Sequence, residues 1–159
     1  MNTYSMFQIK NKRRPDIKTD RQRMNQSLYL IYASQLGGFS ETIEATRDIL
    51  SQEIIWPDQC ERVVNKFGGI KKAAANIARV ARKQDNNSLG HKHYSTFVSA
   101  SYFCEQIDRF IEFIREYREL PDQASAKKSK RTMISSIFHH LDVSLLDLMK
   151  ELDNTLKNS

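Results

Sequence analysis

The chain has 159 residues, of which 40% are hydrophobic and 28% charged, so it favours one folded domain and excludes disorder throughout. Lysine and arginine number 25 against 19 acidic residues, a formal net charge of +6. That excess favours a polyanionic partner, namely nucleic acid, an anionic membrane surface or an acidic protein.

Cysteine usage and hydropathy indicate the cellular compartment in which the protein resides. Cys60 and Cys104 lie in unrelated segments and form no C-x-x-C pair, so we expect two reduced thiols rather than a disulfide framework. The chain contains no run of 18 apolar residues, and its first seven residues lack the basic-then-apolar order of a signal peptide. We therefore expect a cytoplasmic protein without a membrane span.

The first 19 residues are predicted to form a flexible basic arm. Only Asp16 and Asp20 oppose the cations that run from Lys10 to Arg23. These cations are Lys10, Lys12, Arg13, Arg14, Lys18, Arg21 and Arg23. Such a charge run is typical of a segment that becomes ordered on a partner, so Arg13 and Arg14 are candidate nucleic-acid contacts.

About six helices are predicted in one bundle-like, all-α domain over residues 20–159. Their expected ranges are 20–38, 40–55, 57–69, 70–84, 95–120 and about 132–156. Met24, Leu28 and Ile31 recur at helical spacing in the first helix. Glycine pairs are expected to end the first and third helices because glycine accepts the left-handed turn that follows a helix. Residues 126–131 are expected to be a polar basic linker.

The predicted helix over 70–84 carries its charges on one side. There is no acidic residue between Glu61 and Asp85. At about 100° per residue, all five cations of this helix fall within about one third of its circumference, bordered by Asn76. They are Lys71, Lys72, Arg79, Arg82 and Lys83, and the opposite side holds Ile70, Ala73, Ala74, Ile77, Val80 and Ala81.

Crowded like charges cost a helix a few tenths of a kcal/mol per close pair, and phosphates would offset that cost. A helix over 57–69, a turn at Gly68-Gly69 and the basic helix would make a helix-turn-helix-like unit. In that unit Lys72, Asn76 and Arg79 would reach base edges in a major groove, while Lys71, Arg82 and Lys83 would hold phosphates. The alternatives are a solvated basic face and an acidic protein partner.

No other group of residues predicts chemistry. His91, His93, His139, His140 and Cys104 lack the spacing of a zinc site, so no metal and no cofactor is expected. Arg131 precedes His139-His140 by more than one helical turn, with no third group to complete a nuclease site. We therefore expect no catalytic residues and a protein that is not an enzyme.

The last predicted helix has a heptad seam with spacings of 4, 3, 4, 3 and 4. Its residues are Ile134, Phe138, Leu141, Leu145, Leu148 and Leu152. A seam of this kind packs either into the chain's own bundle or against a second copy, as a homodimer.

The charge pattern favours a non-enzymatic nucleic-acid-binding protein, with DNA favoured over RNA, acting as a regulator of transcription or as an accessory factor. The basic helix carries no aromatic residue that would indicate base stacking. The alternative is a helical adaptor or inhibitor that binds an acidic protein.

Overall fold

A computed structural model describes residues 20–86, 90–122 and 124–157 of the chain. Within these ranges every regular element is a helix, which confirms the predicted all-α class. The helices are α2 (Asp20–Gly38), α3 (Ser40–Ser51), α4 (Pro57–Asn86), α5 (Tyr94–Glu119) and α6 (Ser125–Lys157). The predicted arm, with Arg13 and Arg14, lies outside the described residues.

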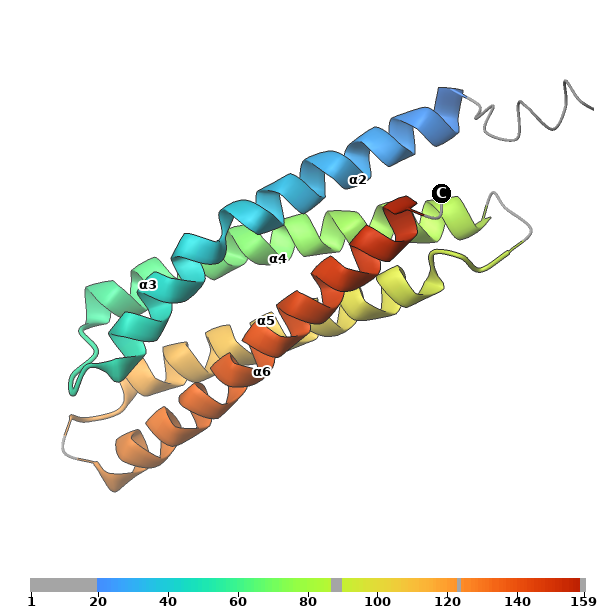
Figure 1. The fold of residues 1–159 in the computed structure, drawn as a ribbon. Helices are drawn as coiled ribbons and strands as arrows, with labels where there is room; N and C mark the ends of the chain where they lie inside the picture. The colour runs from blue at the N-terminus through green and yellow to red at the C-terminus, as the bar shows by residue number, and fades with distance from the viewer. Residues whose placement is uncertain (1–19, 87–89, 123, 158–159) are drawn as a thin grey trace, which may run out of the picture.

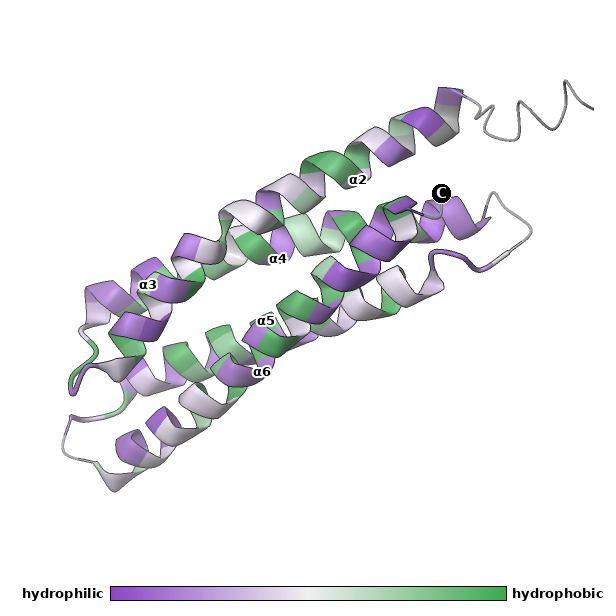
Figure 2. Cartoon of the chain, viewed as in Figure 1, coloured by the Kyte–Doolittle hydropathy of each residue, from purple (hydrophilic) through white to green (hydrophobic). Residues whose placement is uncertain are grey.

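The helices form an elongated antiparallel bundle (Figure 1). Only Phe39 separates α2 from α3, and the two helices follow one line along the bundle. The helix pairs α4–α5 and α5–α6 share the most extensive contacts, α2 lies against α4, and α2 touches α6 only lightly. Hydrophobic and hydrophilic positions alternate along each helix (Figure 2), as one-sided burial requires.

The core lies between α4, α5 and α6 and is centred on three phenylalanines, one from each helix. The ring centroids of Phe67 and Phe110 are 4.8 Å apart, and those of Phe110 and Phe138 are 5.8 Å apart. Phe67 and Phe110 are completely buried. No helix in the described ranges is long and apolar enough to cross a membrane.

Residues 57–86 form one continuous helix, so the predicted break at Gly68-Gly69 is wrong. Neither glycine has a positive φ. Glycine costs a helix interior about 1 kcal/mol relative to alanine, but Phe67 and Ile70 on either side are fully buried, and their packing outweighs that preference. The helix-turn-helix-like unit is therefore wrong as well, and the described residues do not confirm the expected count of six helices.

Helix α6 begins at Ser125, so the residues predicted as a linker belong to its first turns. Two contacts hold these turns in place. Lys127 donates a 3.2 Å hydrogen bond to the carbonyl of Leu120, and Arg131 donates a 3.0 Å bond to the carbonyl of Leu50 and a second bond to that of Glu53. The basic residues of this stretch thus join α6 to the ends of α5 and α3.

The heptad seam of α6 packs into the chain's own core. All six of its residues are buried: Ile134, Phe138, Leu141, Leu145, Leu148 and Leu152. Because these side chains are buried within the bundle, the structure does not support the alternative of a homodimer through the seam.

Candidate nucleic-acid interface on helix α4

Residues 70–84 lie within α4, and the side of this helix that faces the core matches the prediction. Its buried residues are Ile70, Ala73, Ala74, Ile77, Ala78, Val80 and Ala81. Small side chains at four of these positions let α4 lie close to α2 and α5. The cations consequently project from the opposite side of the helix.

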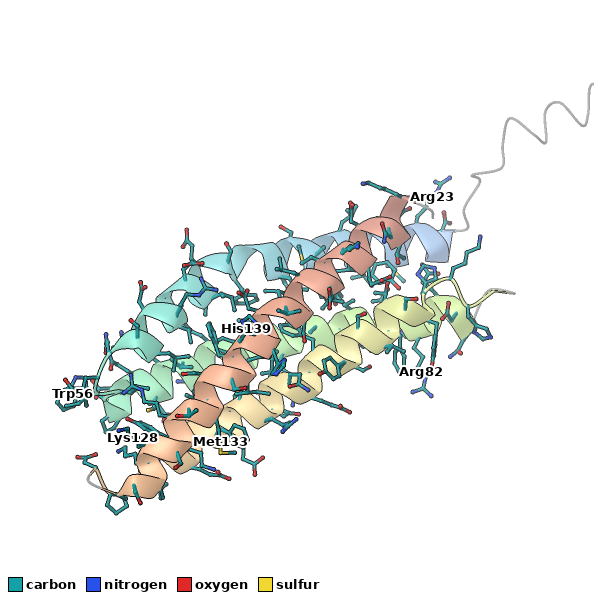
Figure 3. The ribbon with its side chains drawn as sticks, turned by 60° about the horizontal axis from the view of Figure 1, so that its bottom comes forward. Arg23, Trp56, Arg82, Lys128, Met133 and His139 are labelled. Carbon is teal, nitrogen blue, oxygen red and sulfur yellow. The ribbon has the colours of Figure 1, made fainter. Side chains whose placement is uncertain are left out.

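We define the basic arc as Lys72, Arg79, Arg82 and Lys83, all of which are exposed. In the part of the chain that the structure describes, none of the four forms an ion pair. Arg79 donates a 3.1 Å hydrogen bond to Oδ1 of Asn76, which orients its guanidinium on the helix surface. Arg82 points away from the bundle (Figure 3).

Lys71 does not belong to the basic arc, although the sequence placed it there. Its Nζ lies 2.6 Å from Oδ1 of Asp108 on α5, so a carboxylate already neutralises this cation. Cys104 also donates a long hydrogen bond of 3.7 Å from its Sγ to the backbone carbonyl of Lys71. Lys71 therefore lies at the seam between α4 and α5, where it helps to align the two helices.

The surroundings of the basic arc are poor in negative charge. From Arg62 to Cys104 the sequence has one acidic residue, Asp85. Oδ1 of Asp85 accepts a 2.9 Å hydrogen bond from the backbone N–H of His93. The excess of positive charge along this part of α4 attracts a nearby polyanion over a Debye length of about 8 Å at physiological salt.

The start of α5 is fixed against α2 beside this surface. The hydroxyl of Tyr29 is 3.1 Å from Nδ1 of His93, and the two rings stack with centroids 5.6 Å apart. Burial lowers the pKa of His93 and raises the pKa of Tyr29, because each charged form would lose its hydration. Both side chains therefore stay neutral near pH 7 and hold the start of α5 against α2.

The other candidate clusters supply no site. Among the described residues, no three histidine, cysteine or acidic side chains converge on a point that could hold a metal ion. Burial raises the pKa of both Cys60 and Cys104, which leaves their thiols protonated and weakly nucleophilic. Arg131 is occupied by its two carbonyl contacts, and His139 and His140 are exposed.

One exposed aromatic side chain at the start of α5 was missed by the sequence reasoning. Tyr94, the first residue of α5, is 58% exposed, and it is on the neighbouring helix rather than on α4. Its position directly after His91-Lys92-His93, in a stretch without acidic residues, was the available signal.

Comparisons with protein-family models, curated proteins and solved structures found no match to the chain.

Proposed function

We propose that this protein is a non-enzymatic nucleic-acid-binding protein that holds phosphates with the basic arc of α4. The observation that carries the proposal is that Lys72, Arg79, Arg82 and Lys83 are exposed together without a carboxylate partner among the described residues. The fold makes no use of these charges. Each cation that meets a phosphate releases counterions, which supplies a favourable free energy of binding.

The flanking helices favour contact with the phosphate backbone over reading of base edges. A major groove about 12 Å wide admits one helix, and a helix with its side chains is about 10–12 Å across. Because α4 lies between α2 and α5, a groove would have to admit neighbouring helices too. We therefore propose an accessory role with little sequence preference, with Asn76 orienting Arg79 instead of contacting a base.

A titration with salt tests the proposal. Four phosphate contacts predict that affinity for a DNA duplex falls about a hundredfold between about 50 mM and about 200 mM salt. The variant Lys72→Glu/Arg79→Glu/Lys83→Glu is expected to lose at least about a hundredfold in affinity at the lower salt, because repulsion replaces three of the contacts.

A matched control separates position from total charge. The variant Arg115→Glu/Lys128→Glu/Lys150→Glu also changes three exposed cations, so both variants have a formal net charge of 0 instead of +6. It is expected to lose less than about tenfold, through long-range electrostatics alone. Equal losses in the two variants would refute a site on α4.

The adaptor alternative gives a different result in the same experiments. An acidic protein would meet the same cations, so the charge-reversal variant would lose a stoichiometric protein partner. The purified protein would then carry no nucleic acid, and the ratio of its absorbance at 260 and 280 nm would match that of protein alone. That outcome would replace the proposal with the adaptor function.

A further inference from the structure

Tyr94 lies beside the basic arc because of the way in which α4 and α5 are aligned. Three contacts fix this antiparallel alignment: Glu61 with Arg118 at 2.5 Å, Lys71 with Asp108 at 2.6 Å, and Asp85 with the backbone of His93 at 2.9 Å. In each contact the two residue numbers add up to 178 or 179. The same relation places Arg82 and Lys83 level with the first turn of α5.

Rotation about the axis of α5 turns Tyr94 towards α4. At about 100° per residue, Tyr94 is only about 40° from Asp108, which pairs with Lys71 of α4. Tyr102 is about 120° from Asp108 and borders the groove between α5 and α6, together with Met133 and His140. Of the two exposed tyrosines of α5, Tyr94 is thus the one on the side of the basic arc.

The ring of Tyr94 is accessible and yet held in position. Its exposed fraction is 58%, whereas Tyr29 and Tyr117 are 2% and 4% exposed. The ring lies against that of Phe97, with centroids 6.5 Å apart. Directly before it, His93 is anchored to Tyr29 and Asp85, so the backbone under Tyr94 is fixed to both α2 and α4.

An exposed aromatic ring next to unpaired cations fits one class of polyanion. Bases in a duplex are stacked on each other and offer no face to a ring on a protein surface. In a single strand the bases are free to stack on aromatic side chains while cations hold the backbone. Lys92, two residues before Tyr94, is exposed and adds a further cation next to the ring in the sequence.

We infer that the surface formed by Arg79, Arg82, Lys83, Lys92 and Tyr94 binds single-stranded nucleic acid in preference to duplex, with Tyr94 stacking on an unpaired base. This inference rests on the proposed function and specifies its ligand. Ribose and deoxyribose strands share the chemistry that the surface recognises, since a base face and a phosphate are present in both.

The test measures binding of the full chain to three labelled probes by fluorescence anisotropy: oligothymidine, oligouridine and a mixed-sequence DNA duplex, each of about 20 nucleotides or base pairs. The unmodified protein is expected to bind the single strands at least about tenfold more tightly than the duplex. Tyr94→Ala is expected to lose about tenfold on the single strands and less than about twofold on the duplex.

Two further variants test whether the aromatic ring of Tyr94 is responsible for the affinity for single strands. Tyr94→Phe keeps the ring and is expected to retain single-strand affinity within about twofold, because stacking needs no hydroxyl. Tyr102→Ala removes a tyrosine of similar exposure, 49%, which borders the groove between α5 and α6 instead of lying on the side of α4, and it is expected to have no effect. Helical circular dichroism of each variant verifies that the bundle is intact.

The outcomes separate this inference from the proposed function. If Tyr94→Ala binds as the unmodified protein does, or if the duplex is bound as tightly as the single strands, the inference is overturned. The charge-reversal variant of the basic arc would still lose affinity for all three probes in that case. If that variant loses no affinity, the proposed function fails, and the inference fails with it.

Discussion

Cations have different roles in two regions of the molecule. Three cations on α3 and α6 are tied to other groups: Arg47 lies 2.7 Å from Asp142, Lys130 lies 2.5 Å from Glu116, and Arg131 donates hydrogen bonds to two backbone carbonyls. The basic arc of α4 makes no such contact among the described residues. One set of charges joins helices together, and the other faces solvent.

The number of cations in the sequence does not tell which of them are available to a partner. Lys127 and Lys130 carry the same formal charge as Lys72, but they lie over the rings of Tyr117 and Phe113, at 4.6 and 4.9 Å from the centroids. A partner that bound Lys127 or Lys130 would have to break these cation–π contacts, which would reduce the net free energy of binding. A ligand that binds the basic arc meets no such cost, which is why the free energy of binding should be concentrated there.

The largest expected effect on stability comes from breaking a tied cation. Arg131→Met removes both hydrogen bonds to the carbonyls of Leu50 and Glu53, so the free energy of unfolding should fall by about 1–3 kcal/mol. Urea denaturation followed by circular dichroism measures this loss. A change below about 0.5 kcal/mol would mean that Arg131 does not hold α6 to α3.

The continuity of α4 is tested by a substitution that should stabilise the protein. Gly68→Ala/Gly69→Ala is expected to raise the free energy of unfolding by about 1–2 kcal/mol, because both glycines lie inside a helix. A methyl group at Gly68 would meet nothing within 4 Å, and one at Gly69 would make an ordinary contact at 3.8 Å with the ring of Phe39. A fall in the free energy of unfolding would instead indicate that the chain turns at these two glycines, as predicted from the sequence. In that case α4 would not present one continuous surface.

The contact that fixes α5 beside the basic arc should depend on pH. Burial lowers the pKa of His93, so the unfolded chain binds this proton more readily than the folded chain does. The contribution of His93 is therefore complete above its unfolded pKa of about 6.5 and declines as the pH falls below that value. Urea denaturation at about pH 7.5 and about pH 5.5 should show a smaller loss of stability for His93→Gln than for the unmodified protein. Equal losses would mean that other groups cause the pH dependence.

The smallest effect on stability is expected for a substitution on the basic arc. Arg79→Met makes the same substitution as Arg131→Met, but on the basic arc, and the free energy of unfolding should stay within about 0.5 kcal/mol. Affinity for oligothymidine should nevertheless fall several-fold, because one phosphate contact is lost. A loss of stability as large as that of Arg131→Met would remove the distinction between the two sets of cations.

Local sequence patterns predicted the helices and the outward side of α4. The all-α class, the 70–84 segment as helix and its buried side follow from a period of 3.6 residues, and such a period depends on neighbours in the chain. The same reasoning failed for α2 at Met24 and Ile31, which are 58% and 52% exposed, while Tyr29 is buried. Three apolar residues on one side do not reveal which side of a helix meets its partner.

By itself, the sequence determined that the chain is helical and that an arc of α4 is purely basic, because helix period and charge order are local properties. The tertiary structure decided four matters that depend on contacts between distant segments. Asp108 pairs with Lys71, whereas Lys72 forms no ion pair among the described residues. Burial of Phe67 and Ile70 keeps α4 helical through two glycines, and the heptad seam packs into its own bundle. The alignment of α4 and α5 places the first turn of α5 level with Arg82 and Lys83. Each follows from the alignment of packed helices, which is set by the core as a whole and not by the order of neighbouring residues.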